Sequence, residues 1–322
     1  MKFFALAALL GSTQAWWGPG HLLVARIAQD ILEKESPATF DKVLTILHAL
    51  KINDPGYTEA EDKHPFVECA VMADNIKFRG GGYQSGWHYV DTPYVDTPGK
   101  TIKDYPNFVP DTHDNTDALN GLISWMKKDD GYQQNYFYET IMSHVWNQGT
   151  EADGLSTAMR LMIHYIGDVH QPLHATARVD DEFPTGDRGG NSFSLASKDG
   201  AKNLHAVWDS VIYSETGHPT LPIPDSNWNK LGLLAAKLVE EHPVSDVTDL
   251  TSLNPADWAK DSYEVSQTFV YKDIAEGQPL PEDYVEKAQQ LAEKQIVMGG
   301  FRLAHVIMNI YGSQADVQKF LM

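Results

Sequence analysis

The chain carries a single cysteine, Cys69, although its first fifteen residues are typical of a secretory signal. Lys2 precedes an apolar run over residues 3–10, which is too short to cross a bilayer, and no later stretch is apolar enough to do so. One cysteine excludes an intramolecular disulfide and any zinc cage built from thiolates. We therefore expect residues 1–15 to be a cleaved signal peptide and residues 16–322 to form one domain, held by a large apolar core or by metal.

The composition excludes two broad classes of protein. Apolar residues make up 42% of the chain and charged residues 21%, which favours a globular domain over a disordered one. Acidic residues outnumber basic ones by 44 to 25, for a net charge of −19. Such a chain does not bind nucleic acid through a basic surface, because that mode needs clustered lysine and arginine. An enzyme with a locally cationic site remains open.

Apolar residues recur at helical spacing over most of the chain. Helices are expected near residues 22–32, 36–47, 65–78, 116–128, 132–148, 153–169, 203–213, 228–241, 255–275 and 282–311. Gly299-Gly300 is expected to kink the last helix, and residues 92–118 and 180–190 are expected to be loops. A short hairpin is predicted after Asn191, with its turn at Asp199-Gly200. The pattern predicts an all-α domain with one small β-hairpin.

Histidine and aspartate lie at metal-binding spacing in the segment from His164 to His174. His164 and Asp168 are four residues apart, so a helix would place them on one face with Cβ atoms about 5–6 Å apart. His174 follows the helix-ending Pro172 and can turn back toward the same place.

The same kinds of side chain recur elsewhere. His205 and Asp209 repeat the four-residue spacing, Asp74 and Lys77 lie one turn apart, and His88 follows. Each of these has an ordinary interpretation. A histidine–aspartate pair is usually a hydrogen-bonded pair on a helix, an aspartate–lysine pair is usually solvated, and a lone histidine beside aromatics is usually part of the core.

The N-terminus left by signal removal adds a further candidate ligand. Cleavage after Ala15 would give Trp16 a free α-amino group, which can chelate a metal together with its own carbonyl oxygen, and His21 follows five residues later. Cleavage one residue later would instead expose Trp17 and shift the chelate. Two spaced pairs and a chelating terminus are not expected to coincide by chance. Because imidazole and carboxylate ligands suit Zn²⁺, the sequence predicts zinc.

Taken in order from Trp16 to about residue 310, these motifs resemble the secreted zinc-dependent class I single-strand nucleases and 3′-nucleotidases of fungi, plants and protists. That family is related in fold to zinc phospholipase C. The resemblance implies a mostly helical domain with three Zn²⁺ at the base of a cleft, and it assigns Asp168 to two of the ions. The implied ligands are Trp16, His21, Asp74, His88, His164, Asp168, His174, His205 and Asp209.

The resemblance also implies the reaction, which is hydrolysis of single-stranded DNA and RNA to 5′-mononucleotides by zinc-activated water. Asp74 and Asp168 would hold the catalytic metal, and Lys77 would stabilise charge on the phosphate. Three carboxylates contribute −3 against +6 from three ions, so the site would attract a phosphodiester. The partners implied are single-stranded nucleic acid or a 3′-nucleotide, with no protein partner, in a secreted or lysosome-like location.

Three residues are expected to bind substrate. Tyr89 matches a base-stacking aromatic and Asp91 a base-binding acid, although Tyr89 could equally be only part of the wall. Asn191, after Gly189-Gly190, could contact phosphate or sugar, or the glycines could merely begin the hairpin. His170 is interpreted as a structural residue near a helix end. The acidic loop at 180–188 is expected to repel long polyanions if it borders the cleft.

Two other functions stay open. A zinc phospholipase C would share the N-terminal tryptophan and the three-ion site, although Lys77, Tyr89 and the Gly-Gly-Asn run favour the nuclease. A non-catalytic secreted zinc protein is the third possibility, and Lys77 argues against it.

Overall fold

The computed structural model describes residues 16–145, 149–196, 201–211, 220–244 and 250–321. The expected signal at 1–15 and the expected turn at Asp199-Gly200 lie outside these residues. The first half of the chain forms α1 (Gly18–Glu35), α2 (Pro37–Asn53), α3 (Pro65–Glu68), η1 (Cys69–Val71), α4 (Met72–Ile76), η2 (Gly81–His88), β1 (Pro93–Val95), η3 (Ile102–Asp104), α5 (Asn115–Lys127), η4 (Tyr132–Gln134) and α6 (Tyr136–His144). The second half forms α7 (Glu151–Val169), η6 (Pro172–His174), β2 (Ala177–Val179), α8 (Leu204–Ser210), α10 (Asp225–Glu241), α11 (Pro255–Val265), the π-turn η8 (Ser266–Val270), α12 (Tyr284–Tyr311) and α13 (Gln314–Phe320). The fold is all-α, as predicted.

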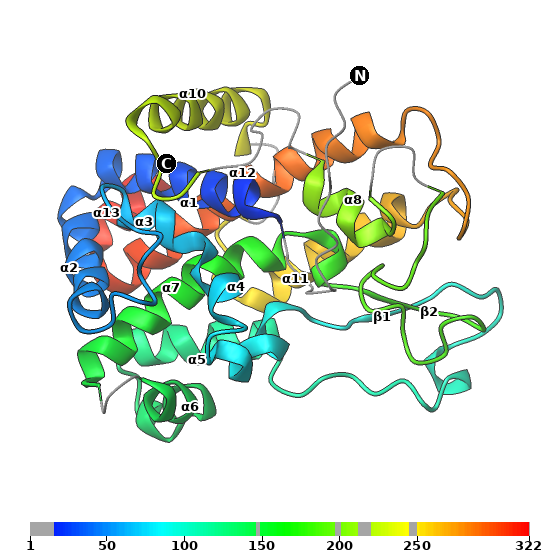
Figure 1. The fold of residues 1–322 in the computed structure, drawn as a ribbon, viewed down its shortest axis with the longest axis horizontal. Coiled ribbons are helices and arrows are strands. Elements are labelled where there is room, and N and C mark those ends of the chain that lie inside the picture. The colour runs from blue at the N-terminus through cyan, green and yellow to red at the C-terminus, as the bar shows by residue number, and fades with distance from the viewer. Residues whose placement is uncertain (1–15, 146–148, 197–200, 212–219, 245–249, 322) are drawn as a thin grey trace.

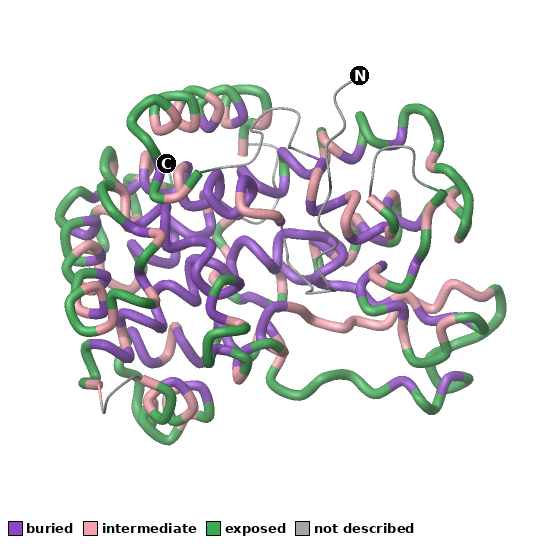
Figure 2. Tube along the Cα trace, in the orientation of Figure 1, coloured by how far each residue is buried: buried purple, intermediate pink, exposed green. Residues whose placement is uncertain are grey.

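Helix α7 runs through the middle of the molecule (Figure 1) and is buried along almost its whole length (Figure 2). Thr150 caps its start, and Asp153 completes a capping box by accepting from the Thr150 backbone N–H. Helices α1, α2, α5 and α12 all pack against it. A helix that is covered on every side needs small and apolar residues all round, and polar groups only where they find partners. His164 and Asp168 are such groups, because both side chains are fully buried on this helix.

Helix α12 packs along α1 and is continuous across Gly299-Gly300. The glycine pair does not end the helix, and the expected kink stays a prediction. A Cβ atom on Gly300 would lie 2.6 Å from the Cβ atom of Ile27, so the glycine allows the two helices to approach closely. This contact fixes α1, and with it the position of His21.

Three expected helices are interrupted. The segment 65–78 divides into α3, η1 and α4, residues 132–148 contain η4 and the shorter α6, and the helix expected at 255–275 ends at Val265 in a π-turn. Apolar periodicity continues across these breaks, which is why the sequence pattern does not mark them. Helix α13, which begins with the capping pair Ser313 and Asp316, was not expected.

The strands differ from the prediction. A two-stranded parallel sheet pairs Pro93 with Ala177, Tyr94 with Arg178 and Val95 with Val179. Strand β1 lies inside the loop expected at 92–118, and β2 ends just before the loop expected at 180–190. Among the described residues of the expected hairpin, Ser194 and Asn203 form an antiparallel bridge. Three-residue strands carry too few residues for an alternating pattern, and a parallel partner distant in sequence leaves no local signal.

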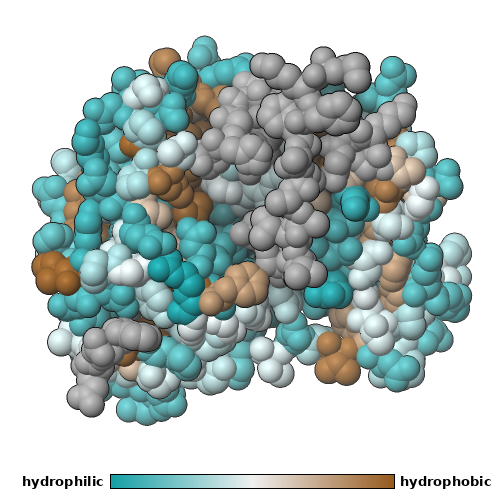
Figure 3. All heavy atoms as spheres, in the orientation of Figure 1, coloured by the Kyte–Doolittle hydropathy of each residue, from teal (hydrophilic) through white to brown (hydrophobic). Residues whose placement is uncertain are grey.

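The face shown in Figure 3 is largely hydrophilic, with apolar residues scattered over it. Within the described ranges, no helix combines the length and the apolar character needed to cross a membrane.

Candidate active site

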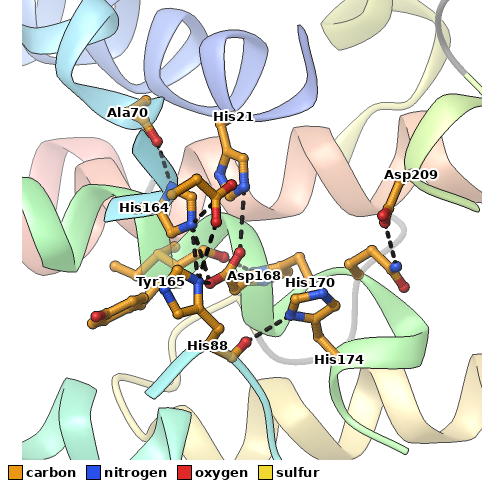
Figure 4. Close-up of polar contacts among 12 residues, drawn as sticks. His21, Ala70, His88, His164, Tyr165, Asp168, His170, His174 and Asp209 are labelled. Atoms are coloured by element: carbon orange, nitrogen blue, oxygen red, sulfur yellow. Dashed lines mark hydrogen bonds and ion pairs between the residues drawn. The ribbon is translucent and has the colours of Figure 1, made fainter. Parts of the chain in front are cut away.

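Four buried side chains from three parts of the chain converge at the end of α7. One oxygen of Asp168, Oδ2, lies 2.8 Å from Nδ1 of His88 and 3.3 Å from Nε2 of His164. The other oxygen, Oδ1, lies 3.3 Å from Nε2 of His21 (Figure 4). The predicted spacing of His164 and Asp168 on one helix face is therefore present, and α1 and η2 supply the other two imidazoles.

Close packing between α1 and α7 positions His21. A Cβ atom on Gly167 would lie 2.5 Å from Nδ1 of His21, so only glycine leaves room for the ring at this point of α7. The His21 ring stacks on His164, with centroids 3.8 Å apart and an interplanar angle of 15°. Two neutral imidazoles can stack in this way, whereas two cations would repel each other.

Asp74 extends the cluster from α4. Its two oxygens lie 3.8 Å from Nδ1 of His88 and from Nε2 of His164 respectively. The Lys77 ammonium, one turn later, donates to Oδ1 of Asp74 over 2.8 Å, and both side chains are only 7% exposed. A buried cation is thus held at the edge of the cluster by a carboxylate that also faces two imidazoles.

A second group lies beside the first. Nε2 of His205 lies 3.3 Å from Nε2 of His174 and 3.4 Å from Oδ2 of Asp209. Helix α8 positions two of these residues, and it begins where the Asn203 side chain accepts from the N–H of Ala206. His174 Nδ1 donates to the His88 carbonyl over 2.6 Å, which joins the two groups through the backbone.

In every ring of the two groups except His21, the outer nitrogen is fixed by a hydrogen bond. Nδ1 of His164 donates to the Ala70 carbonyl and Nδ1 of His205 to the Gly189 carbonyl, each over 2.6 Å. His88 is reversed, because its Nε2 meets Oε1 of Gln84 at 2.7 Å. Such hydrogen bonds select the tautomer, so the nitrogen facing the centre of each group is the one that carries a free lone pair.

Several buried polar atoms at the centre have no well-aligned hydrogen-bond partner within the described part of the chain. They are both oxygens of Asp168 and both ring nitrogens of His21. Leaving such groups unsatisfied costs about 1–3 kcal/mol each, and bound cations would satisfy them. The donor set of imidazole and carboxylate is the set that zinc accepts.

Three groupings place their ligand atoms within 4.8 Å of one another and could each hold a metal ion. They are His21, His164 and Asp168; Asp74, His88 and His164; and His174, His205 and Asp209. A fourth grouping, of Glu241, His242 and Glu293, shares no residue with these. Eight of the nine predicted ligands therefore come together through their side chains. The ninth, Trp16, is fully buried next to Trp17, whose N–H donates to the Asp209 carbonyl over 3.2 Å.

Burial and neighbouring charges set the protonation of these groups. Burial lowers the pKa of His88 and of His174 to about 4, so both rings are neutral at pH 7 and able to bind metal. Burial alone would raise the pKa of Asp74, but His164, Lys77 and His88 lower it to about 2. Burial raises the pKa of Asp209 well above its usual range, although Gln171 donates to it over 2.8 Å. A cation beside Asp209 would favour the carboxylate.

The sequence profile of the family described as S1/P1 Nuclease matches residues 16–312. The chain belongs to the S1/P1 nuclease family. It is therefore a nuclease, a hydrolase that cleaves the phosphodiester bonds of nucleic acids, and the resemblance predicted from the motifs is confirmed.

Similar proteins span nearly the full length of this nuclease. Endonuclease 4 of Arabidopsis thaliana is 26% identical over 97% of the chain and 95% of its own length. Nuclease S1 of Aspergillus oryzae is 24% identical over 93% of each protein. Nuclease P1 of Penicillium citrinum is 27% identical over 93% of the chain and 99% of its own length.

A pocket of about 100 Å³ in the nuclease adjoins the second group. It is lined by Tyr89, Asp91, Leu173, His174, Arg188, Gly189, Asn191 and His205. All three residues predicted to bind substrate thus line one pocket together with two histidines that could hold metal. Asn191 does more than follow two glycines, because its Nδ2 donates to the Arg188 carbonyl over 2.8 Å and fixes the side chain at the rim.

The sequence interpretation missed Arg188, which lies in the acidic loop at 180–188. Arg188 is exposed and lines the pocket, whereas Asp187 is fully buried. Asp180 pairs with Arg178 over 2.9 Å, and Asp181 pairs with Lys100. Two of these acids are thus paired with cations and the third is buried, while the expected repulsion of long polyanions stays a prediction. The sequence signal that could have identified Arg188 is its position as a cation next to a glycine pair within an acidic segment.

The charged groups around the pocket affect the pKa of Asp91. Burial, followed by the nearby charges of Asp111 and Asp187, raises the pKa of Asp91 to about 7. Arg188 acts in the opposite direction by favouring the carboxylate. The pocket therefore pairs an acid that is readily protonated with an exposed cation.

His170 is structural, in agreement with the sequence interpretation. Its Nδ1 donates to the Ile166 carbonyl over 2.6 Å, and its Nε2 lies 3.0 Å from the Arg302 guanidinium. Burial and the Arg302 charge lower the pKa of His170 to about 3. Both ring nitrogens therefore contact groups other than the candidate metal ligands.

Proposed function

We propose that this nuclease is a zinc-dependent endonuclease and 3′-nucleotidase that hydrolyses single-stranded DNA and RNA to 5′-mononucleotides. The proposal rests on the position of two histidines, His174 and His205. Both belong to a grouping that could hold a metal ion, and both line the pocket with Tyr89, Asp91 and Asn191. A phosphate attached to a nucleoside in that pocket would therefore lie beside metal.

The chain supplies a ligand set for three ions. Asp74, His88, His164 and Asp168 would hold one ion, Trp16, His21 and Asp168 a second, and His174, His205 and Asp209 a third. When bound, zinc supplies a water of near-neutral pKa and Lewis acidity toward the phosphate oxygens. The neutral rings of His88 and His174 need not lose a proton before they bind.

The remaining residues act directly on the substrate. Lys77, held by Asp74, would place a positive charge beside the phosphate, where negative charge must be stabilised during phosphoryl transfer. Tyr89 would stack on a base, which a paired and stacked duplex does not make available, and this accounts for a preference for single strands. Asp91 and Asn191 would contact the base and the sugar-phosphate.

The substrate and metal are tested together. We expect the mature protein to contain three zinc ions by mass spectrometry, to release 5′-mononucleotides from single-stranded DNA and RNA, to release phosphate from 3′-nucleotides, and to lose these activities after chelation. Turnover of phosphatidylcholine without turnover of nucleic acid would instead support the phospholipase C alternative. Absence of zinc from active protein would contradict the proposed cofactor.

The proposed ligand role of Trp16 makes the N-terminus part of the site. We propose that residues 1–15 direct secretion and are removed after Ala15. The location of Trp16 supports this, because the chain passes from the Asp209 carbonyl, which binds the Trp17 N–H, to His21 beside Asp168. Trp16 lies against Gly20, in the first turn of the helix that carries His21, so an α-amino group at residue 16 would lie near that end of the helix.

Blocking that amino group is expected to weaken the enzyme. Protein purified with two extra residues ahead of Trp16 should lose one zinc ion and about 10–100-fold of its activity, the usual scale for a disturbed metal site. Metal content and hydrolysis of single-stranded DNA are measured against protein that begins at Trp16. Full zinc content and unchanged activity in the extended protein would refute the proposed chelate.

A further inference from the structure

The turn from Asp187 to Asn191 has an unusual backbone. Three consecutive residues, Arg188, Gly189 and Gly190, have φ values of 58°, 59° and 76°. A Cβ atom on Gly189 would lie 2.3 Å from the Leu173 carbonyl oxygen, so that position requires glycine. Arg188 carries a Cβ atom in the left-handed region, which costs about 1–2 kcal/mol. Something must hold the turn in this conformation.

Asp187 supplies the restraint. Its carboxylate accepts from the N–H of Arg178 over 3.0 Å and from the Tyr271 hydroxyl over 2.7 Å. The backbone N–H of Gly190 also favours the charged form of this carboxylate and acts to lower its pKa. The Asp187 backbone adds two bonds, because its N–H donates to the Arg178 carbonyl and its carbonyl accepts from Ser192, each over 2.9 Å. One fully buried acid thus connects β2, the turn and the residue that follows the π-turn.

The turn in its restrained form holds His205. The Gly189 carbonyl accepts from Nδ1 of His205 over 2.6 Å, and the Gly190 carbonyl accepts from the His205 N–H over 3.3 Å. The first bond sets the ring tautomer and the second fixes the start of α8. The inner nitrogen of His205 faces His174 and Asp209 only while both bonds are in place.

We propose that Asp187 is a positioning residue for the metal ion of His174, His205 and Asp209, acting through Gly189 and Gly190. The inference rests on the proposed function, since it assumes that this grouping binds zinc. Asp187 itself has no place in the ligand set. Its effect passes through two backbone carbonyls.

A carboxylate suits this position because the Arg178 N–H and the Tyr271 hydroxyl both donate to it. An asparagine would keep one oxygen for the Arg178 N–H, but its amide would face the Tyr271 hydroxyl, which would then have to accept instead of donate. Arg178 does not substitute as a direct ion pair, because its guanidinium lies 3.1 Å from Asp96 and 2.9 Å from Asp180. Asp187→Asn would therefore reverse the bond to Tyr271 and replace charge-assisted hydrogen bonds by neutral ones, which loosens the turn.

The test is a zinc titration of three full-length mature proteins. Wild type, Asp187→Asn and Asp96→Asn are equilibrated over a range of buffered free Zn²⁺, and zinc per chain is counted by mass spectrometry alongside activity on single-stranded DNA. We expect Asp187→Asn to need about 10–100-fold more free zinc for its third ion, with activity recovering as that ion binds. Asp96→Asn removes a neighbouring acid that also contacts Arg178, and it should titrate like wild type.

The possible results distinguish the positioning role of Asp187 from the proposed nuclease function. Wild-type zinc affinity in folded Asp187→Asn would overturn the positioning role while leaving the nuclease proposal intact, even if the variant melts at a lower temperature. If Asp187→Asn does not fold, Tyr271→Phe decides the question, because it removes the hydroxyl that donates to Asp187 and should weaken the third ion less but measurably. An unchanged third ion in Tyr271→Phe would then refute the inference. Wild-type protein without zinc would refute both.

Discussion

Asp168→Asn is expected to lower the hydrolysis of single-stranded DNA by at least about 1,000-fold. The substitution keeps the shape of the side chain but removes the negative charge that faces His21, His88 and His164. It also turns one acceptor into a donor at a fully buried position. A metal ion contributes several kcal/mol to catalysis, and each 1.36 kcal/mol is a factor of ten in rate. The loss is large because one carboxylate is proposed to serve two ions.

Asp209→Asn is the matched control for this prediction. Asp209 is also buried and also four residues after a histidine, but its contacts are with His205 and the Gln171 amide, whereas Asp168 faces three imidazoles. We expect Asp209→Asn to weaken one ion only and to cost less activity than Asp168→Asn, which is proposed to weaken two. Zinc counting should therefore show a larger loss of metal from Asp168→Asn. Comparable rates and metal contents in the two variants would contradict the proposal that Asp168 is shared.

Lys77→Met is expected to lower kcat by about 100–1,000-fold, the usual effect of removing one group that stabilises charge in the transition state. Lys77 is almost fully buried and its ammonium donates to Asp74, so its charge is fixed in place before substrate arrives. Methionine keeps most of the side-chain volume and removes the charge. Because the ammonium is not a metal ligand, zinc content should stay at the wild-type value.

Two controls make the Lys77 prediction specific. Lys77→Arg should retain part of the activity, since it restores a positive charge with a different donor geometry. Lys63→Met removes a surface lysine whose side chain is 59% exposed and pairs with Asp225. It should leave kcat unchanged. A full loss of zinc in Lys77→Met would show that the residue supports the metal site, which would contradict a direct role toward phosphate.

The parts of the site that the sequence predicts best are those encoded by local spacing. His164 with Asp168, and His205 with Asp209, are each one helical turn apart, and a helix brings such pairs together whatever the rest of the fold does. Helix α7 shows the same rule at the level of the fold. Its apolar periodicity and capping residues are local, and the expected and observed bounds differ by two residues at one end only.

The features that sequence spacing does not predict depend on contacts between distant segments. The parallel pairing of Pro93 with Ala177 joins positions far apart in the chain, with strands too short to show a pattern. The interruption of the helix expected at 65–78 places the Ala70 carbonyl where His164 can donate to it. The role of Asp187 follows from Arg178 and Tyr271, which lie on either side of it at distances no motif contains.

The acceptors that hold the outer nitrogens of His164, His174 and His205 are main-chain carbonyls of Ala70, His88 and Gly189. Every amino acid carries that carbonyl, so the tautomers are encoded by the path of the backbone rather than by residue type. Position 70 can therefore drift in evolution without disturbing its acceptor, provided that the chain keeps its course. Position 189 cannot, because a side chain there would collide with Leu173. An inherited architecture of this kind can diverge widely in sequence while the imidazole geometry stays constant.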